Sequence, residues 1–165
     1  MKLADFIDVT QCEDAPQAVQ TLFRRKYGRD LPEFPHHVVA SYQSTQGGAA
    51  TPVCYVHFTD CGDILLGGGA CVDNRQLRRM DARQRDAIRT AGGIYQYTLR
   101  WSVAHFAPRF AAVFGYCGDA LAERIDRAVG FESTTHDHLL VFWTRDVDAR
   151  RQRQMIAKAQ AFAPF

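Results

Sequence analysis

The segment from Phe110 to Phe131 (FAAVFGYCGDALAERIDRAVGF) places the strongest constraint on the fold of this chain. It opens with an apolar run, Phe110–Phe114, which is typical of a strand buried on both faces. Asp119 follows a glycine-broken turn, and its carboxylate can accept the free amide hydrogens of a helix's first turn. The next apolar residues recur at helical spacing, with charged residues such as Asp126 on the other side, until Gly130 ends the helix. The apolar positions are Leu121, Ile125, Ala128 and Val129. This order predicts half of an α/β layer.

Length and composition indicate one domain over residues 1–165, with residues 145–165 as a C-terminal helical tail. Apolar residues make up 47% of the chain and charged residues 23%, an ordinary balance for a globular protein. No apolar run reaches the length that spans a bilayer, and Met1–Thr10 contains Asp5 and Asp8 where a signal peptide would be apolar. We therefore expect no membrane association.

The five cysteines are an odd number and contain no CxxC pair. They predict neither a disulfide framework nor a zinc site. Cys54, Cys71 and Cys117 fall inside or just after predicted strands and are interpreted as small core residues. A reducing cytoplasm fits this pattern best.

Local patterns predict the remaining elements in chain order. Met1–Val9 is either an edge strand or an unstructured lead, and Gln46–Ala50 is predicted as a turn. Further predictions are helices at Glu13–Tyr27, Asn74–Ile88 (a solvated charged excursion), Ile94–Phe106 and Asp146–Ala161, and strands at His37–Gln43, Pro52–Thr59, Ile64–Val72 and Leu139–Trp143. The three glycines of Gly67–Gly69 indicate either a wide turn that splits a strand or a close approach by a bulge, ligand or backbone.

Read together with Asp119-x-x-Ala122…Gly130-Phe131, this order resembles the GCN5-related N-acetyltransferase (GNAT) superfamily. A second segment, Arg89-Thr-Ala-Gly-Gly-Ile94, is similar to that family's pyrophosphate loop. Glycines let the backbone approach a ligand, and free amides at a helix start bind anions. The resemblance implies an α/β three-layer sandwich with a mixed, mainly antiparallel sheet.

The resemblance also implies acetyl-CoA or another acyl-CoA as donor. The cofactor-binding residues that it implies are Ala70, Cys71, Val72, Arg89, Gly92, Gly93, Ile94, Asp119 and Ala122. The sequence departs from the family pattern at three places. Ile94 replaces a small residue, and Asn74–Ile88 is inserted before the loop. Asp126 stands where the family often has a tyrosine that acts as general acid toward the CoA thiolate. The alternative, purely structural interpretation is that the Arg89–Ile94 segment is a helix-to-helix turn and that Asp119 is a simple N-cap.

Three residues are candidates for catalysis. Tyr116 is the nearest alternative phenol to act as general acid, or a wedge between sheet and helix. Asp73 is a candidate base or a turn residue, and His57 is a candidate base or a structural histidine. His136-Asp137-His138 lacks an evident third ligand, so we predict no metal.

The first functional hypothesis is an acyl-CoA-dependent N-acyltransferase acting on an amine of a small molecule or protein. A second is a GNAT-like binding or interaction module without transfer activity, which Ile94 and Asp126 favour. A third is a nucleic-acid-directed, base-modifying enzyme, motivated by the arginines of Asn74–Arg89 and Arg145–Arg153; a net charge of only +2 disfavours it. The oligomeric state stays open at this point, and a homodimer is one alternative because many relatives pair through sheet edges.

Overall fold

The computed structural model describes residues 1–44 and 49–165. The predicted turn at Gln46–Ala50 lies partly outside the described residues. The helices are η1 (Leu3–Asp5), α1 (Gln17–Tyr27), α2 (Asn74–Arg79), α3 (Ala82–Thr90), α4 (Ile94–Phe106), α5 (Ala120–Val129) and α6 (Ala149–Gln160). The strands are β1 (Ile7–Cys12), β2 (His36–Tyr42), β3 (Thr51–Cys61), β4 (Ile64–Val72), β5 (Ala112–Tyr116), β6 (Glu132–Ser133) and β7 (Leu139–Trp143).

The described strands form one mixed sheet in the order β1-β2-β3-β4-β5-β7-β6. The β1–β2, β5–β7 and β6–β7 pairs are antiparallel, whereas β4 and β5 are parallel. This arrangement confirms the predicted α/β class with a mixed, mainly antiparallel sheet. Of the predicted segment Met1–Val9, only residues 7–9 belong to a strand, the edge strand β1, whereas residues 3–5 form η1.

The chain divides into two compact units, 1–57 with 70–98 and 58–69 with 99–165. Strands β3 and β4 contribute residues to both units, so the description of the chain as one domain stays a prediction. In the first unit, α1 packs its apolar side on the sheet. Its core consists of Val19, Leu22, Phe23, Val39, Tyr55 and Cys71.

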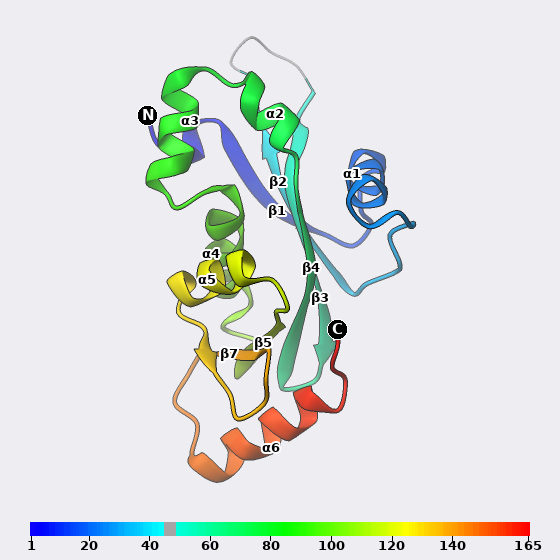
Figure 1. Cartoon of the computed structure of the whole chain (residues 1–165), viewed down its shortest axis with the longest axis vertical. Helices are drawn as coiled ribbons and strands as arrows, with labels where there is room; N and C mark the ends of the chain where they lie inside the picture. Colours follow the sequence, from blue (N-terminus) through cyan, green and yellow to red (C-terminus); the bar gives the residue numbers. More distant parts are fainter. Residues whose placement is uncertain (45–48) are drawn as a thin grey trace. The chain divides into compact units, whose positions relative to one another are not determined.

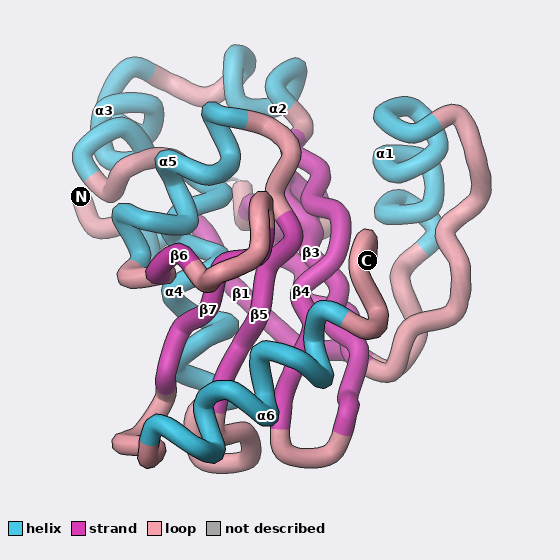
Figure 2. The backbone as a smooth tube through the Cα atoms, turned by 60° about the horizontal axis from the view of Figure 1, so that its bottom comes forward, coloured by secondary structure: helices cyan, strands magenta, loops and turns pink. Residues whose placement is uncertain are grey.

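The core of the second unit lies where α6 crosses β4 and β5 (Figure 2). It consists of Ile64, Leu66, Ala112, Phe114, Leu139, Val141, Met155 and Ala159. The carboxylate of Asp63, just before β4, accepts hydrogen bonds from Lys158 and Arg151 of α6. These charge-assisted contacts fix the helix over the strands that it covers. The three cysteines predicted as core, Cys54, Cys71 and Cys117, are buried, which confirms that interpretation.

Strand β4 runs without interruption through Gly67–Gly69, so the interpretation of these glycines as a turn is wrong. A Cβ atom on Gly67 would lie 3.2 Å from the Phe58 ring and 3.4 Å from the carbonyl oxygen of Phe114. Such contacts are tighter than ordinary packing, so the missing side chain makes room for these neighbours. The alternative interpretation, a close approach, is the one that the structure supports.

The predicted helical excursion over Asn74–Ile88 is helical, and it contains two helices, α2 and α3, that follow β4 (Figure 1). Asp81 begins α3 by accepting a hydrogen bond from the amide of Gln84, while the Gln84 side chain bonds back to the amide of Asp81. This reciprocal capping box starts a new helix. The prediction that this segment is solvated is wrong at Met80, Gln84 and Ile88, which are buried.

Candidate functional site

The predicted pyrophosphate loop joins α3 to α4 in the first unit. Gly92 and Gly93 have φ angles of +86° and +100°, which only glycine adopts readily. Their amides donate to the carbonyl oxygens of Arg89 and Ile88 over 3.0 and 2.9 Å, so they already cap the end of α3. An anion at this loop would therefore face the N-terminus of α4, where the helix dipole is positive, rather than the amides of the two glycines.

The side chain of Gln96 covers Gly92 within this loop. A Cβ atom on Gly92 would lie 2.3 Å from the side-chain oxygen of Gln96. Ile94, the departure from the family motif, is buried and begins α4. Arg89 is exposed, and its guanidinium lies 2.8 Å from the carboxylate of Asp86 one turn earlier. An exposed pair of this kind is weak, so Arg89 can turn toward a bound phosphate.

The C-terminal end of β4 has an edge that β5 does not pair. The parallel register ends at Gly67↔Gly115, whereas β4 continues to Val72. On this stretch the carbonyl oxygen of Ala70 accepts hydrogen bonds from Lys26 Nζ (2.8 Å) and the Tyr27 hydroxyl (3.1 Å). The last turn of α1 thus occupies an acceptor that the resemblance assigns to the cofactor.

Lys26 and Tyr27 did not emerge from the sequence as site residues. They stand more than forty positions before Ala70, and no local motif links the two segments. Burial, with the nearby Cys71 thiol adding to it, raises the pKa of Tyr27 to about 12 although Arg29 opposes the shift. Its hydroxyl therefore stays a donor across the physiological range. Cys71 itself is buried, which raises its pKa to about 11.

Asp73 follows β4 as the N-cap of α2. Its Oδ1 atom accepts hydrogen bonds from the amides of Arg75 and Gln76, and Oδ2 lies 3.5 Å from the guanidinium of Arg25. The turn-residue interpretation accounts for these contacts. A role as base stays a prediction.

His57 lies in an aromatic cluster of the first unit. It is 6% exposed, and its Nδ1 atom has no hydrogen-bond partner among the described residues. Desolvation, assisted by the charges of His37 and Arg29, lowers its pKa to about 3. The imidazole is therefore neutral at pH 7 but too weak a base to take up a proton there, and its environment favours the structural interpretation.

Tyr116 belongs to the second unit, at the end of β5. Its half-buried ring contacts His138 and Phe165 edge-on, with centroid distances of 5.9 and 6.1 Å. Cys117 follows, and its Sγ donates to the carbonyl oxygen of Asp119 over 3.3 Å. Desolvation raises the pKa of this thiol, which disfavours a thiolate nucleophile.

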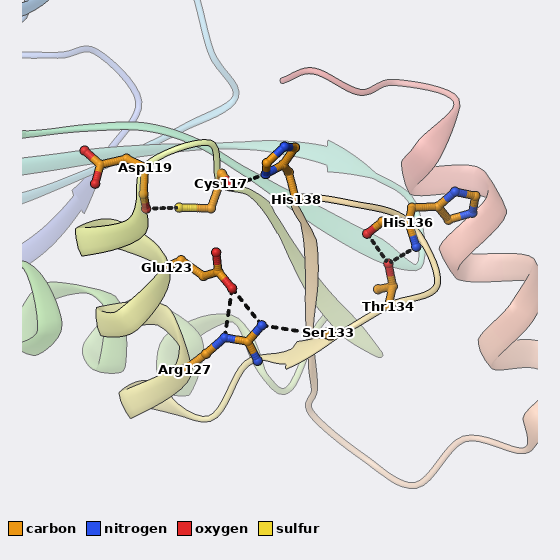
Figure 3. A network of polar contacts seen from close by, with 8 residues as sticks. All are labelled: Cys117, Asp119, Glu123, Arg127, Ser133, Thr134, His136 and His138. Atoms are coloured by element: carbon orange, nitrogen blue, oxygen red, sulfur yellow. Dashed lines mark hydrogen bonds and ion pairs between the residues drawn. The ribbon is translucent and has the colours of Figure 1, made fainter.

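Asp119 caps α5, as predicted. Its Oδ1 atom accepts from the amides of Leu121 and Ala122 over 2.7 and 3.3 Å. Figure 3 shows Asp119 at the start of α5 and, farther along the helix, the ion pair in which Arg127 binds Glu123 and reaches Ser133. The N-cap accounts for the position of Asp119, and a further contact of Asp119 or Ala122 with a ligand stays a prediction.

The predicted polar side of α5 is wrong at Asp126, which is 6% exposed, while Leu121 on the predicted apolar side is 58% exposed. The Asp126 carboxylate faces β5, where a Cβ atom on Gly115 would lie 3.8 Å from it. A glycine on the strand leaves space for this side chain. The position where the family often has a tyrosine therefore faces inward.

The two histidines of His136-Asp137-His138 point apart (Figure 3). His138 Nδ1 lies 3.1 Å from the carbonyl oxygen of Cys117, and the amide of His136 donates to the Thr134 hydroxyl. Among residues 1–44 and 49–165, no group of three or more metal-binding side chains is clustered. No helix in the same described part is both long and apolar enough to cross a membrane.

Two solved structures from Escherichia coli share this architecture. The ribosomal-protein-S18-alanine N-acetyltransferase superimposes with a TM-score of 0.54 at 10% identity, over 86% of this chain and 97% of the other. YhhK, provisionally described as an N-acetyl transferase and bound to coenzyme A, gives 0.54 at 13% identity over 83% and 98%. The chain has the GNAT fold. No family model matches the sequence, and no match was found among curated proteins.

Proposed function

We propose that this protein transfers an acyl group from acyl-CoA to an amine. The observation that carries the proposal is the loop at the start of α4, where two left-handed glycines and Arg89 precede the N-terminus of a thirteen-residue helix. Two neighbours with the same fold support it, since one is an N-acetyltransferase and the other was solved with coenzyme A. Fold alone does not fix activity, so the proposal depends on this site.

In the proposed reaction, the amine nitrogen attacks the thioester carbonyl and forms an amide, and the CoA thiolate leaves and takes up a proton. Most aliphatic amines are protonated at pH 7, so a proton must leave the acceptor first. Asp73 is the candidate base, directly or through water. Tyr116 is a candidate donor to the thiolate and is tested separately, because it belongs to the other unit.

Calorimetric titration of acetyl-CoA into the purified protein tests the donor site. Arg89→Ala should weaken binding about tenfold through loss of a charge-assisted contact with phosphate. Arg83→Ala is its matched control, because Arg83 is an exposed arginine on the same helix. Gly92→Glu should abolish binding, whereas Gly28→Glu controls for strain at a left-handed glycine with open space around it. Equal binding by all four variants would contradict the assigned loop.

Two conservative variants test the catalytic candidates by amide formation with a panel of amines. Asp73→Asn keeps an N-cap, since asparagine caps helices as well as aspartate does, but it cannot take up a proton. Tyr116→Phe keeps the ring contacts and removes the hydroxyl. For each variant, a fall in kcat with an unchanged KM for acetyl-CoA supports the catalytic role of the replaced residue. An unchanged kcat contradicts that role.

The buried Asp126 favours a second candidate function, a GNAT-fold binding module without transfer activity. Its carboxylate stands where the family often has a tyrosine hydroxyl as the proton donor, so that donor is missing from this position. Acetyl-CoA binding without turnover of any amine in the panel would support this alternative. Product formation with wild-type protein would exclude it.

A further inference from the structure

A pocket of about 220 Å³ lies in the α2–α3 segment, within the first unit. Its lining residues are Asn74, Leu77, Arg78, Arg85, Ile88 and Arg89. A water molecule occupies about 30 Å³ in the liquid, so the pocket has room for a phosphate group and part of the sugar that carries it. Three of its six lining residues are arginines, and none is acidic.

The charge of this segment differs from that of the rest of the chain. Residues 74–90 contain six arginines and two aspartates, a net charge of +4 in a chain whose total is +2. Asp81 is occupied as the N-cap of α3, and among the described residues Asp86 pairs with Arg89. The positive charge near the pocket is therefore largely uncompensated, which raises the local concentration of anions.

The arginines of the pocket are held differently. Arg85 donates to the carbonyl oxygens of Arg78 and Met80, which ties α3 to the end of α2. The side chain of Arg78 is exposed and makes no hydrogen bond or ion pair with any residue that the structure describes. One guanidinium is thus fixed by the backbone and another is available. Planar guanidinium groups bind phosphate oxygens in pairs of parallel hydrogen bonds.

The remaining walls are apolar. Leu77 is half-buried and Ile88 is buried, so the pocket combines a hydrophobic floor with a cationic rim. A small hydrated anion gains nothing from the floor. A nucleotide can use both parts, because its phosphate meets the arginines and its sugar or base covers the aliphatic side chains.

We propose that the α2–α3 pocket binds the phosphomonoester group of a nucleotide, through Arg78, Arg85 and Arg89. The ligand is either a free nucleotide or the 3′-phosphate end of CoA, and only the second source rests on the proposed acyltransferase function. A monoester is favoured over a backbone phosphodiester because it carries nearly two charges for the arginines to share.

Titration of adenosine 3′,5′-bisphosphate, with adenosine as the uncharged reference, tests the pocket without any acyl group. Wild-type protein should bind the bisphosphate at least about tenfold more tightly than adenosine, and Arg78→Gln should remove about tenfold of that affinity. Arg83→Gln, an exposed arginine of α3 outside the pocket lining, should change it less than twofold. Thermal melting should be the same for both variants, because neither side chain makes a hydrogen bond or ion pair within residues 1–44 and 49–165.

A comparison of CoA with dephospho-CoA then identifies the source. If wild-type protein binds dephospho-CoA more weakly than CoA, and Arg78→Gln binds the two equally, the pocket belongs to the 3′-phosphate of CoA. If wild-type protein binds both equally, the pocket belongs to a free nucleotide. The proposal is overturned if Arg78→Gln binds the bisphosphate like Arg83→Gln, or if an oligonucleotide lacking terminal phosphates binds more tightly than the bisphosphate. Gly92→Glu separates the two hypotheses, since it should abolish acetyl-CoA binding but keep the difference in bisphosphate affinity that Arg78→Gln causes.

Discussion

Phe34 and His57 lie face to face, with ring centroids 3.5 Å apart and ring planes within 9° of parallel. Tyr55, Phe23 and His37 complete the surroundings of this pair. Such a site excludes water, so desolvation opposes protonation of the imidazole. If His57 has a structural role, its protonation should change the free energy of unfolding.

We predict that stability falls in acid because of His57. Its folded-state pKa is lowered to about 3 from 6.5, so the unfolded state binds the proton first. The contribution is complete above pH 6.5 and is lost as the pH falls toward 3, with a slope of up to about 1.4 kcal/mol per pH unit. Urea unfolding at pH 7, 6, 5 and 4 measures it. His57→Leu should show a smaller loss over that range than wild type, and identical slopes would contradict the assignment.

The second prediction concerns Gly67. Gly67→Ala should lower the free energy of unfolding by about 1–3 kcal/mol, because the new methyl group meets the Phe58 ring at 3.2 Å and a backbone oxygen at 3.4 Å. Gly118→Ala is the matched control, since a Cβ atom there has nothing within 4 Å. Urea midpoints compare the two. Equal destabilisation by the two variants would mean that the close contacts at Gly67 do not affect the free energy of unfolding.

The third prediction concerns the link between Asp63 and α6. Burial raises the pKa of Asp63, but the hydrogen bond and charge of Lys158, with Arg151 adding its charge, lower it overall. Asp63→Asn should therefore destabilise the protein by about 1 kcal/mol at pH 7. The effect should be present above pH 3.8 and be lost as the pH falls below it. Asp30→Asn, in a far more exposed pair with Arg24, should change stability by less than about 0.5 kcal/mol.

The elements with local signals were the ones predictable from sequence. Asp119 and Gly130 bound α5 as expected, because a cap and a left-handed glycine act within one turn of chain. The break between α2 and α3 was missed although Asp81 and Gln84 carry the spacing of a capping box. The capping-box signal is present in the sequence, but the segment was interpreted from its many arginines instead.

Features that depend on contacts between different elements could not be predicted. Periodicity assigns the charged residues of α5 to solvent, yet Asp126 faces inward, where Gly115 of the preceding strand β5 leaves space for its side chain. The occupation of the Ala70 carbonyl depends on where the end of α1 packs. No residue near position 70 encodes that arrangement.

The last prediction follows from this occupied carbonyl. A carbonyl oxygen has two lone pairs, and Lys26 and Tyr27 use both on Ala70. If the amide hydrogens of pantetheine bind β4 there, they must displace one of these donors. The double variant Lys26→Met, Tyr27→Phe should then bind acetyl-CoA several-fold more tightly by calorimetry, since the acceptor is already free. Lys2→Met, Tyr97→Phe is a control with the same chemical changes and no contact with Ala70. Unchanged affinity in the double variant would show that the cofactor does not use this carbonyl, and weaker affinity would show that Lys26 or Tyr27 binds the cofactor itself.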